Sequence, residues 1–173
     1  LQQHHFDSYT AGSDMKMYQI APKPGVFRWE RVDSIVAYTN KNNQRLFGHT
    51  LIWHSATPKW IEKKAKKDPA WLEGFMKNYI QTYIKKYKGI VHGWDVVNEG
   101  LNTKGAGFRT ESIWYKTMGQ SYIEKAFRYA HEADPNAVLF YNDFNIERDT
   151  LKFNTMMKMV EDFQQRDVPI SGI

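Results

Sequence analysis

A chain of 173 residues with 42% hydrophobic and 25% charged side chains can bury a core, which excludes a disordered segment, a collagen-like repeat and a disulfide-stabilised miniprotein. Lys and Arg number 24 against 19 Asp and Glu, and the net charge of +5 is spread along the chain, so charge alone names no partner. The absence of cysteine excludes thiol catalysis, disulfides and Cys-ligated metal sites. The apolar runs are far shorter than the roughly 20 residues of a membrane span, so no membrane partner is expected.

Short runs rich in Val, Leu, Ile and aromatic residues, each ending in polar residues, predict three buried strands. These runs cover residues 46–53, 91–98 and 138–145. Residues 6–16 are predicted to hold an earlier strand with its loop, and residues 169–173 have the pattern of the start of a later strand.

Apolar residues at helical spacing lie around these strands and predict helices over 31–42, 71–87, 113–130 and 150–165. Asp68 and Pro69 supply the N-cap and first position of the second helix. The residues predicted to face inward are Val32, Ile35 and Val36 in the first helix, and Leu151, Met156, Met157, Val160 and Phe163 in the last.

The alternation of strands and helices predicts an α/β fold with a parallel sheet and right-handed crossovers, either open or closed into a barrel. Polar residues gather at or near the C-terminal strand ends, where both folds keep their active sites, so an enzyme is favoured. These residues are His49, His54, Asn98, Glu99, Asn142, Asp143 and Asn145. A complete barrel needs about 250 residues, so either the sheet is open or this chain is roughly half of a barrel.

The run from Trp94 to Glu99 brings an amide and a carboxyl side chain to the end of one strand. A carboxyl group surrounded by aromatic residues is suited to act as a general acid. The spacing is equally consistent with a carboxylate that forms a salt bridge with a Lys or Arg of a helix. Strict alternation sorts the side chains onto two faces. One face holds Asp95, Val97 and Glu99, and the other holds Trp94, Val96 and Asn98.

Three strings carry a resemblance to a known family: GHTLIWH at 48–54, WDVVNE at 94–99 and YNDFN at 141–145. In order and spacing they resemble the signatures at the third, fourth and fifth strands of family 10 glycoside hydrolases, the endo-β-1,4-xylanases. Residues 10–16 match the loop after the second strand less well. The resemblance implies a (β/α)8 TIM barrel, and residues 1–173 would be a partial catalytic domain with about strands two to five and the start of the sixth.

The resemblance also implies roles for individual residues. Glu99 would be the general acid/base of a retaining mechanism, and Asn98 would hydrogen-bond the 2-hydroxyl of the sugar at the scissile bond. The implied sugar-binding residues are Lys16, His49 and Trp53 on the non-reducing side, and Tyr141 and Asn142 on the leaving-group side. No cofactor is implied, and no metal site is predicted because His49 and His54 have no evident third ligand.

Two departures from the family pattern affect these expectations. Gly12 and Ser13 stand where the family has a Glu-Asn pair, so binding of the distal sugar should be weaker. The family's nucleophile, a Glu on the seventh strand, has no candidate before Ile173. We therefore expect the acid/base half of a barrel whose other half is on another chain or segment, or lost, and we expect the isolated chain to be inactive.

The expected substrates are xylan and xylo-oligosaccharides, which implies an extracellular, periplasmic or cell-surface location because the polymer does not enter cells. Another β-glycanase, such as a cellulase or mannanase, is an alternative that residues 48–54 disfavour. A non-catalytic carbohydrate-binding barrel is a second alternative. Lys63, Lys64, Lys66 and Lys67 are interpreted as a solvated helix surface, so no nucleic-acid partner is expected.

Overall fold

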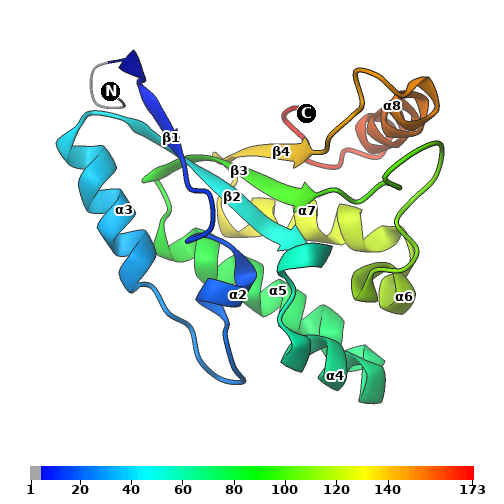
Figure 1. Cartoon of the computed structure of the whole chain (residues 1–173), viewed down its shortest axis with the longest axis horizontal. Helices are drawn as coiled ribbons and strands as arrows, with labels where there is room; N and C mark the ends of the chain where they lie inside the picture. The colour runs from blue at the N-terminus through cyan, green and yellow to red at the C-terminus, as the bar shows by residue number, and fades with distance from the viewer. Residues whose placement is uncertain (1–4) are drawn as a thin grey trace.

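A four-stranded parallel sheet forms the centre of the computed structural model, which describes residues 5–173 (Figure 1). The strands are β1 (Ser8–Thr10), β2 (Arg45–Trp53), β3 (Val91–Asn98) and β4 (Val138–Asn142), in the spatial order β1-β2-β3-β4. A doubly wound sheet reverses its order at a switch point, whereas sequential order with right-handed crossovers keeps the helices on one face. The sheet is therefore part of a barrel wall, as expected.

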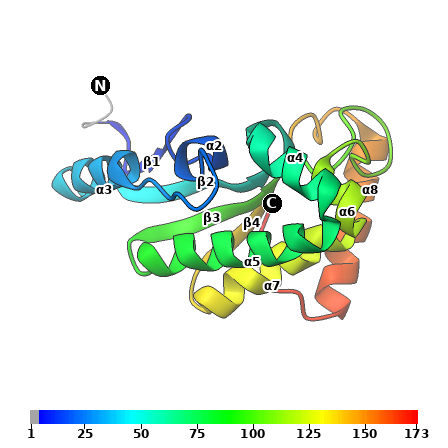
Figure 2. The ribbon, with the colours of Figure 1, turned by 90° about the horizontal axis from the view of Figure 1, so that it is seen from below.

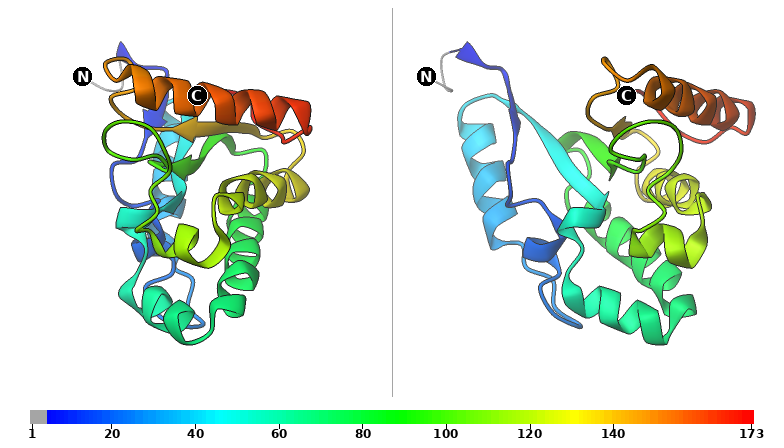
Figure 3. Two further views of the ribbon diagram at one scale, coloured as in Figure 1. Left: turned by 90° about the vertical axis from the view of Figure 1, so that its right-hand side faces the viewer. Right: turned by 45° about the vertical axis from the view of Figure 1, so that its right-hand side comes forward.

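The helices are α2 (Met17–Ile20), α3 (Glu30–Lys41), α4 (Lys59–Lys67), α5 (Pro69–Lys86), α6 (Ile113–Met118), α7 (Ser121–Ala133) and α8 (Thr150–Gln165), with a 3-10 turn η1 (His54–Ala56) after β2. Helices α5 and α7 lie side by side beneath β3 (Figure 2). Helix α8 lies on the β4 side of the sheet, away from β1 and α3 (Figure 3). Among the described residues, no helix has the length and apolar content needed to cross a bilayer.

Most predicted elements are confirmed, including the start of α5, where the Asp68 carboxylate accepts a hydrogen bond from the backbone N–H of Trp71 at 3.3 Å. Two boundaries are wrong. The helix predicted over 113–130 is divided into α6 and α7 at Gly119, whose φ of 61° leaves the helical region. The strand predicted to reach residue 145 ends at Asn142. The basic run interpreted as a solvated helix surface lies on a separate helix, α4, with its lysines exposed, as predicted.

A further error concerns the first turn of α8. Leu151 was predicted to face inward but is 61% exposed, and the next residue, Lys152, is fully buried. The side chain of Lys152 is drawn inward by an ion pair with Asp143, whose side chain is also fully buried. Hydrophobic periodicity cannot anticipate this exchange because it assumes that charged side chains face solvent.

The helix-facing side of the sheet forms the core, with the Trp94 ring of β3 packed 4.9 Å from the Tyr83 ring of α5. On the other face, Phe47 and Phe140 are half-buried, with ring centroids 6.5 Å apart. The segment after α8 extends the sheet, since Ser171 N–H donates to the carbonyl of Leu139 at 2.8 Å. The predicted start of a later strand is present as an isolated parallel bridge between Phe140 and Gly172.

Gly48 is required by the packing of β2 against β3. A Cβ atom at this position would overlap the indole ring of Trp94, which is itself buried. We expect Gly48→Ala to lower the free energy of unfolding by about 1–3 kcal/mol, the usual cost of overpacking, as measured by urea unfolding. Gly74→Ala in α5 is the matched control: its Cβ meets no atom within 4 Å, so unchanged or increased stability is expected there. Equal effects of the two substitutions would contradict this account.

Candidate active site

The residues predicted to act on a ligand lie where β2, β3 and β4 end, on one side of the molecule (Figure 1). Each strand contributes at this end: β2 carries His49 and Trp53, β3 ends in Asn98 with Glu99 directly after it, and β4 ends in Asn142. The parallel order of the strands makes them meet, because C-terminal ends of parallel strands share an edge.

His49 is held by a carboxylate to which the sequence motifs gave no role. Its Nδ1 lies 2.7 Å from Oδ2 of Asp95, and both side chains are largely buried. The two residues are partners in the register of β2 and β3, so they lie side by side on the same face. Asp95 thereby fixes the orientation of the imidazole ring, and only the strand register reveals this partnership.

Lys16 and Trp53 come together with His49, as the resemblance implies. The ammonium of Lys16, at the start of α2, lies 4.5 Å from the centroid of the Trp53 ring. The rings of Trp53 and His49 have centroids 6.3 Å apart. A cation, an imidazole and an aromatic wall at one place suit a neutral ligand that has both hydroxyl groups and apolar ring faces.

Gly12 and Ser13 lie exposed in the loop after β1, shortly before Lys16 along the chain. A Cβ atom at Gly12 would meet nothing within 4 Å. The rim is therefore open at the position where the resemblance expects a carboxylate and an amide.

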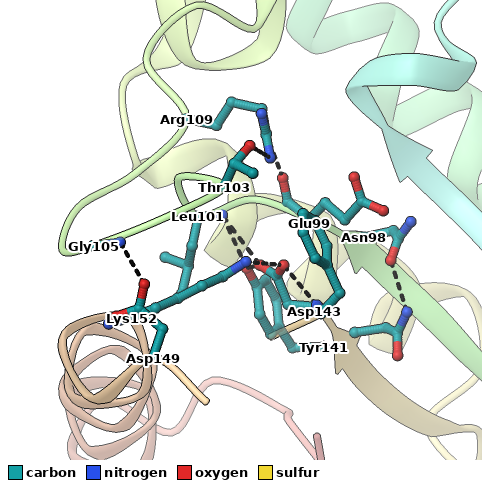
Figure 4. Close-up of polar contacts among 12 residues, drawn as sticks. Asn98, Glu99, Leu101, Thr103, Gly105, Arg109, Tyr141, Asp143, Asp149 and Lys152 are labelled. Atoms are coloured by element: carbon teal, nitrogen blue, oxygen red, sulfur yellow. Dashed lines mark hydrogen bonds and ion pairs between the residues drawn. The ribbon is translucent and has the colours of Figure 1, made fainter. Parts of the chain in front are cut away.

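Asn98 and Asn142 are joined by a hydrogen bond of 2.7 Å, from Nδ2 of Asn142 to Oδ1 of Asn98 (Figure 4). The predicted strict alternation along β3 is wrong here. Asp95 pairs with Phe140, and Asn98 pairs with Asn142. The strand β3 therefore advances by three residues where β4 advances by two, which shifts the register after Asp95. Because Phe140 and Asn142 share one face of β4, the extra residue brings Asn98 to the face of Asp95.

Glu99 follows β3 and leaves the strand conformation, with a φ of 55°. Its backbone N–H donates to the carbonyl of Asn142 at 2.8 Å, and its side chain is half-buried. The carboxyl group of Glu99 and the amide of Asn98 project to the same side, away from α8 (Figure 4). This arrangement gives one carboxyl with an amide neighbour at the mouth of the strands.

Tyr141 does not reach the site, and its predicted contact with a ligand does not fit the structure. Its side chain is fully buried, and its hydroxyl donates to Oδ2 of Asp143 at 2.6 Å while accepting from the N–H of Leu101 at 3.1 Å. Burial raises the pKa of this hydroxyl well above its usual value, so it remains a proton donor to Asp143. Tyr141 therefore stabilises the loop after Glu99 through its hydrogen bond with Leu101.

Two further basic residues lie near Glu99: His54, which the sequence placed among the polar residues at the strand ends, and Arg109, which does not stand out in the sequence. Arg109 is buried and donates from Nε to the carbonyl of Glu99 at 3.0 Å. Burial lowers the pKa of His54, the charge of Arg109 lowers it further, and the charge of Glu99 opposes both. The imidazole is therefore neutral at neutral pH and adds no positive charge beside Glu99.

The arrangement combines a candidate proton donor with groups that bind hydroxyls and apolar ring faces. Among residues 5–173, no group of three or more His, Asp or Glu side chains could hold a metal ion. The chemistry available to these residues is proton transfer and hydrogen bonding to a bound ligand.

Comparison with known proteins gives consistent matches over the whole chain. Residues 1–173 match the model of glycosyl hydrolase family 10. A β-1,4-xylanase of Dictyoglomus thermophilum is 41% identical over 169 residues, which are 98% of this chain and 47% of that protein.

Solved structures give the same result. A GH10 structure from Paenibacillus barcinonensis has a TM-score of 0.91 at 41% identity. The matched region is 97% of this chain and 52% of the Paenibacillus chain. Xylanase 10B from Thermotoga petrophila, in complex with xylobiose, has a TM-score of 0.90 at 37% identity. The matched region is 99% of this chain and 51% of the Thermotoga chain. The chain thus spans about half the length of these relatives.

Proposed function

This chain belongs to glycosyl hydrolase family 10, and from that premise we propose that it forms the acid/base half of an enzyme that hydrolyses internal β-1,4-xylosidic bonds of xylan with retention of configuration. The observation that carries the proposal is the convergence of Glu99 with the Asn98–Asn142 pair at the ends of two neighbouring strands, β3 and β4. The alternative reading of Glu99 as a carboxylate paired with a helix Lys or Arg has no support, because among the described residues no ion pair involves it.

In the proposed mechanism, the protonated Glu99 gives its proton to the glycosidic oxygen as the bond to the anomeric carbon breaks. A second carboxylate attacks that carbon from the opposite side and forms a glycosyl-enzyme intermediate. Glu99, now ionised, removes a proton from the water that displaces the enzyme. Asn98 hydrogen-bonds the sugar 2-hydroxyl, an interaction that strengthens as positive charge develops on the ring.

The second carboxylate is proposed to come from the other half of the barrel, outside residues 1–173. Retaining enzymes hold the two carboxyl groups about 5–5.5 Å apart, and both must face the same sugar. This requirement makes residues 1–173 insufficient for turnover on their own. The half that is present would still contribute the proton donor and the non-reducing-side contacts.

The proposed ligands are xylan and xylo-oligosaccharides, and the xylobiose bound to the Thermotoga petrophila relative supports this class. Lys16, His49 and Trp53 would bind the sugars on the non-reducing side. Weaker binding of the distal sugar is proposed because Gly12 offers no side chain. A location outside the cytoplasm is proposed from the size of the polymer.

The test compares the purified 173-residue chain with a complete family 10 barrel that contains it. We expect reducing-sugar release from xylan by the complete barrel and none by the chain alone, because a single carboxyl cannot both protonate and attack. Carboxymethylcellulose and mannan are the control substrates and should be cleaved far more slowly. Turnover by the isolated chain would contradict the half-site proposal. Binding of xylo-oligosaccharides by the complete barrel without turnover would favour a carbohydrate-binding protein instead.

A further inference from the structure

We propose that the buried guanidinium of Arg109 is a positioning residue for Glu99, which sets where the carboxyl group meets the leaving oxygen. This inference rests on the proposed function, since it assigns a task to a residue that contacts only the backbone of the proposed acid/base. Three observations support it: the unusual backbone of Glu99, the contacts of Arg109, and the independent anchoring of the loop that carries Arg109.

The backbone of Glu99 needs external support. A φ of 55° is left-handed, which residues with a Cβ atom adopt at a cost in free energy and keep only when their surroundings hold them there. This turn directs the carboxyl group out of the strand and toward the Asn98 amide (Figure 4). Relaxation of the turn to an ordinary conformation would move the carboxyl group.

Arg109 forms hydrogen bonds with the backbone of this turn. Its Nε donates to the carbonyl of Glu99 at 3.0 Å, and its own backbone N–H donates to the carbonyl of Gly100 at 2.9 Å. The rest of the guanidinium donates to Thr103 Oγ1 at 3.3 Å and to Glu111 Oε1 at 3.1 Å. The side chain is only 9% exposed, so these contacts are shielded from water.

The loop that carries Arg109 is anchored without the help of Glu99. Residues 101 and 108 form an antiparallel bridge that folds the loop back on itself. The loop is also tied to α8, because Gly105 N–H donates to Asp149 at 2.7 Å and Gly107 N–H donates to Thr155 Oγ1 at 3.2 Å. The position of Arg109, and with it the hydrogen bond to the carbonyl of Glu99, is therefore fixed by contacts that do not involve Glu99.

An arginine is suited to this task because its planar fork can serve three acceptors at once. A lysine at position 109 would keep the charge but could not reproduce the geometry. If the role were only to stabilise the fold, substitution would impair all substrates alike. If Arg109 positions the proton donor, substitution slows the first chemical step only for substrates whose leaving group must be protonated.

The experiment uses the complete barrel with Arg109→Met and Arg109→Lys, assayed on xylo-oligosaccharides and on dinitrophenyl xylobioside, whose leaving group needs no proton. The matched control is Arg128→Met in α7, since Arg128 also donates to a backbone carbonyl, that of Arg166 at 2.9 Å, and to a carboxylate, that of Glu124 at 2.9 Å. We expect Arg109→Met to lower kcat on xylo-oligosaccharides at least about tenfold more than it lowers the rate of the first dinitrophenol release from the activated substrate, measured by rapid mixing. The KM for xylo-oligosaccharides should change little. Arg109→Lys should give an intermediate ratio, and Arg128→Met should keep the unsubstituted ratio.

Equal losses on both substrates, or unchanged activity on both, would overturn the positioning role. If Arg109→Met fails to fold, the ratio for Arg109→Lys decides in the same way. The proposed function is tested separately by the unsubstituted barrel. If that barrel does not cleave xylan, the function fails; if it does and the ratios stay constant, only the role of Arg109 fails.

Discussion

Substitution of Glu99 by Ala in a complete barrel is expected to lower kcat on xylo-oligosaccharides by about 10²- to 10⁴-fold, the usual contribution of general acid–base catalysis. The first chemical step on dinitrophenyl xylobioside should fall far less, because its leaving group departs without a proton. Rapid-mix measurement of dinitrophenol release isolates that step from the later hydrolysis of the intermediate.

The matched control for this prediction is Glu111→Ala, which removes a carboxylate that also contacts Arg109 but is 62% exposed. Its activity on xylo-oligosaccharides should stay within a few-fold of the unsubstituted enzyme. Equal losses on both substrates for Glu99→Ala would argue against the acid role. Activity of Glu99→Ala close to that of Glu111→Ala would remove Glu99 from the proposed mechanism altogether.

The largest expected loss of stability comes from Lys152→Met. Its ammonium lies 2.6 Å from Oδ1 of Asp143 with both side chains fully buried, so the substitution leaves a buried carboxylate without its counter-charge. Removing one partner of such a pair costs about 3–5 kcal/mol, which urea unfolding would measure. The ammonium also lies 4.1 Å from the centroid of the Phe144 ring, and that contact is lost with it.

Lys158→Met is the matched control, since Lys158 is an exposed lysine of the same helix and its loss should change stability by about 0.5 kcal/mol or less. Adding Asp143→Asn to Lys152→Met should recover part of the loss, because the uncompensated charge is then removed. A loss for Lys152→Met no larger than that for Lys158→Met would contradict the account of a buried pair.

Patterns within single elements allowed much of the fold to be predicted. β3 and α8 have the predicted limits, and β2 begins one residue earlier than predicted. Asp68 and Pro69 form the predicted start of α5. These features depend on local hydrophobic periodicity and on hydrogen bonds between near neighbours in the chain, which the residue order itself specifies.

The candidate site could be predicted only in part. The three motif strings place Trp53 and the Asn98–Glu99 pair at strand ends and His49 within β2, and Lys16 joins them from the start of α2. Tyr141 was predicted to contact the ligand, but its hydroxyl is engaged below the site by Asp143 and Leu101. Which way a side chain points at the end of a strand depends on neighbours that lie far away in the chain.

The sequence by itself therefore determined the order of strands and helices, their helical or extended periodicity and the family of the chain. Only the tertiary structure decided that Asn98 shares a face with Asp95, that Lys152 is buried in place of Leu151, and that Arg109 reaches the carbonyl of Glu99. The physical reason is that register shifts and buried ion pairs are set by contacts between segments, so one extra residue in a strand or one distant counter-charge reverses what periodicity predicts.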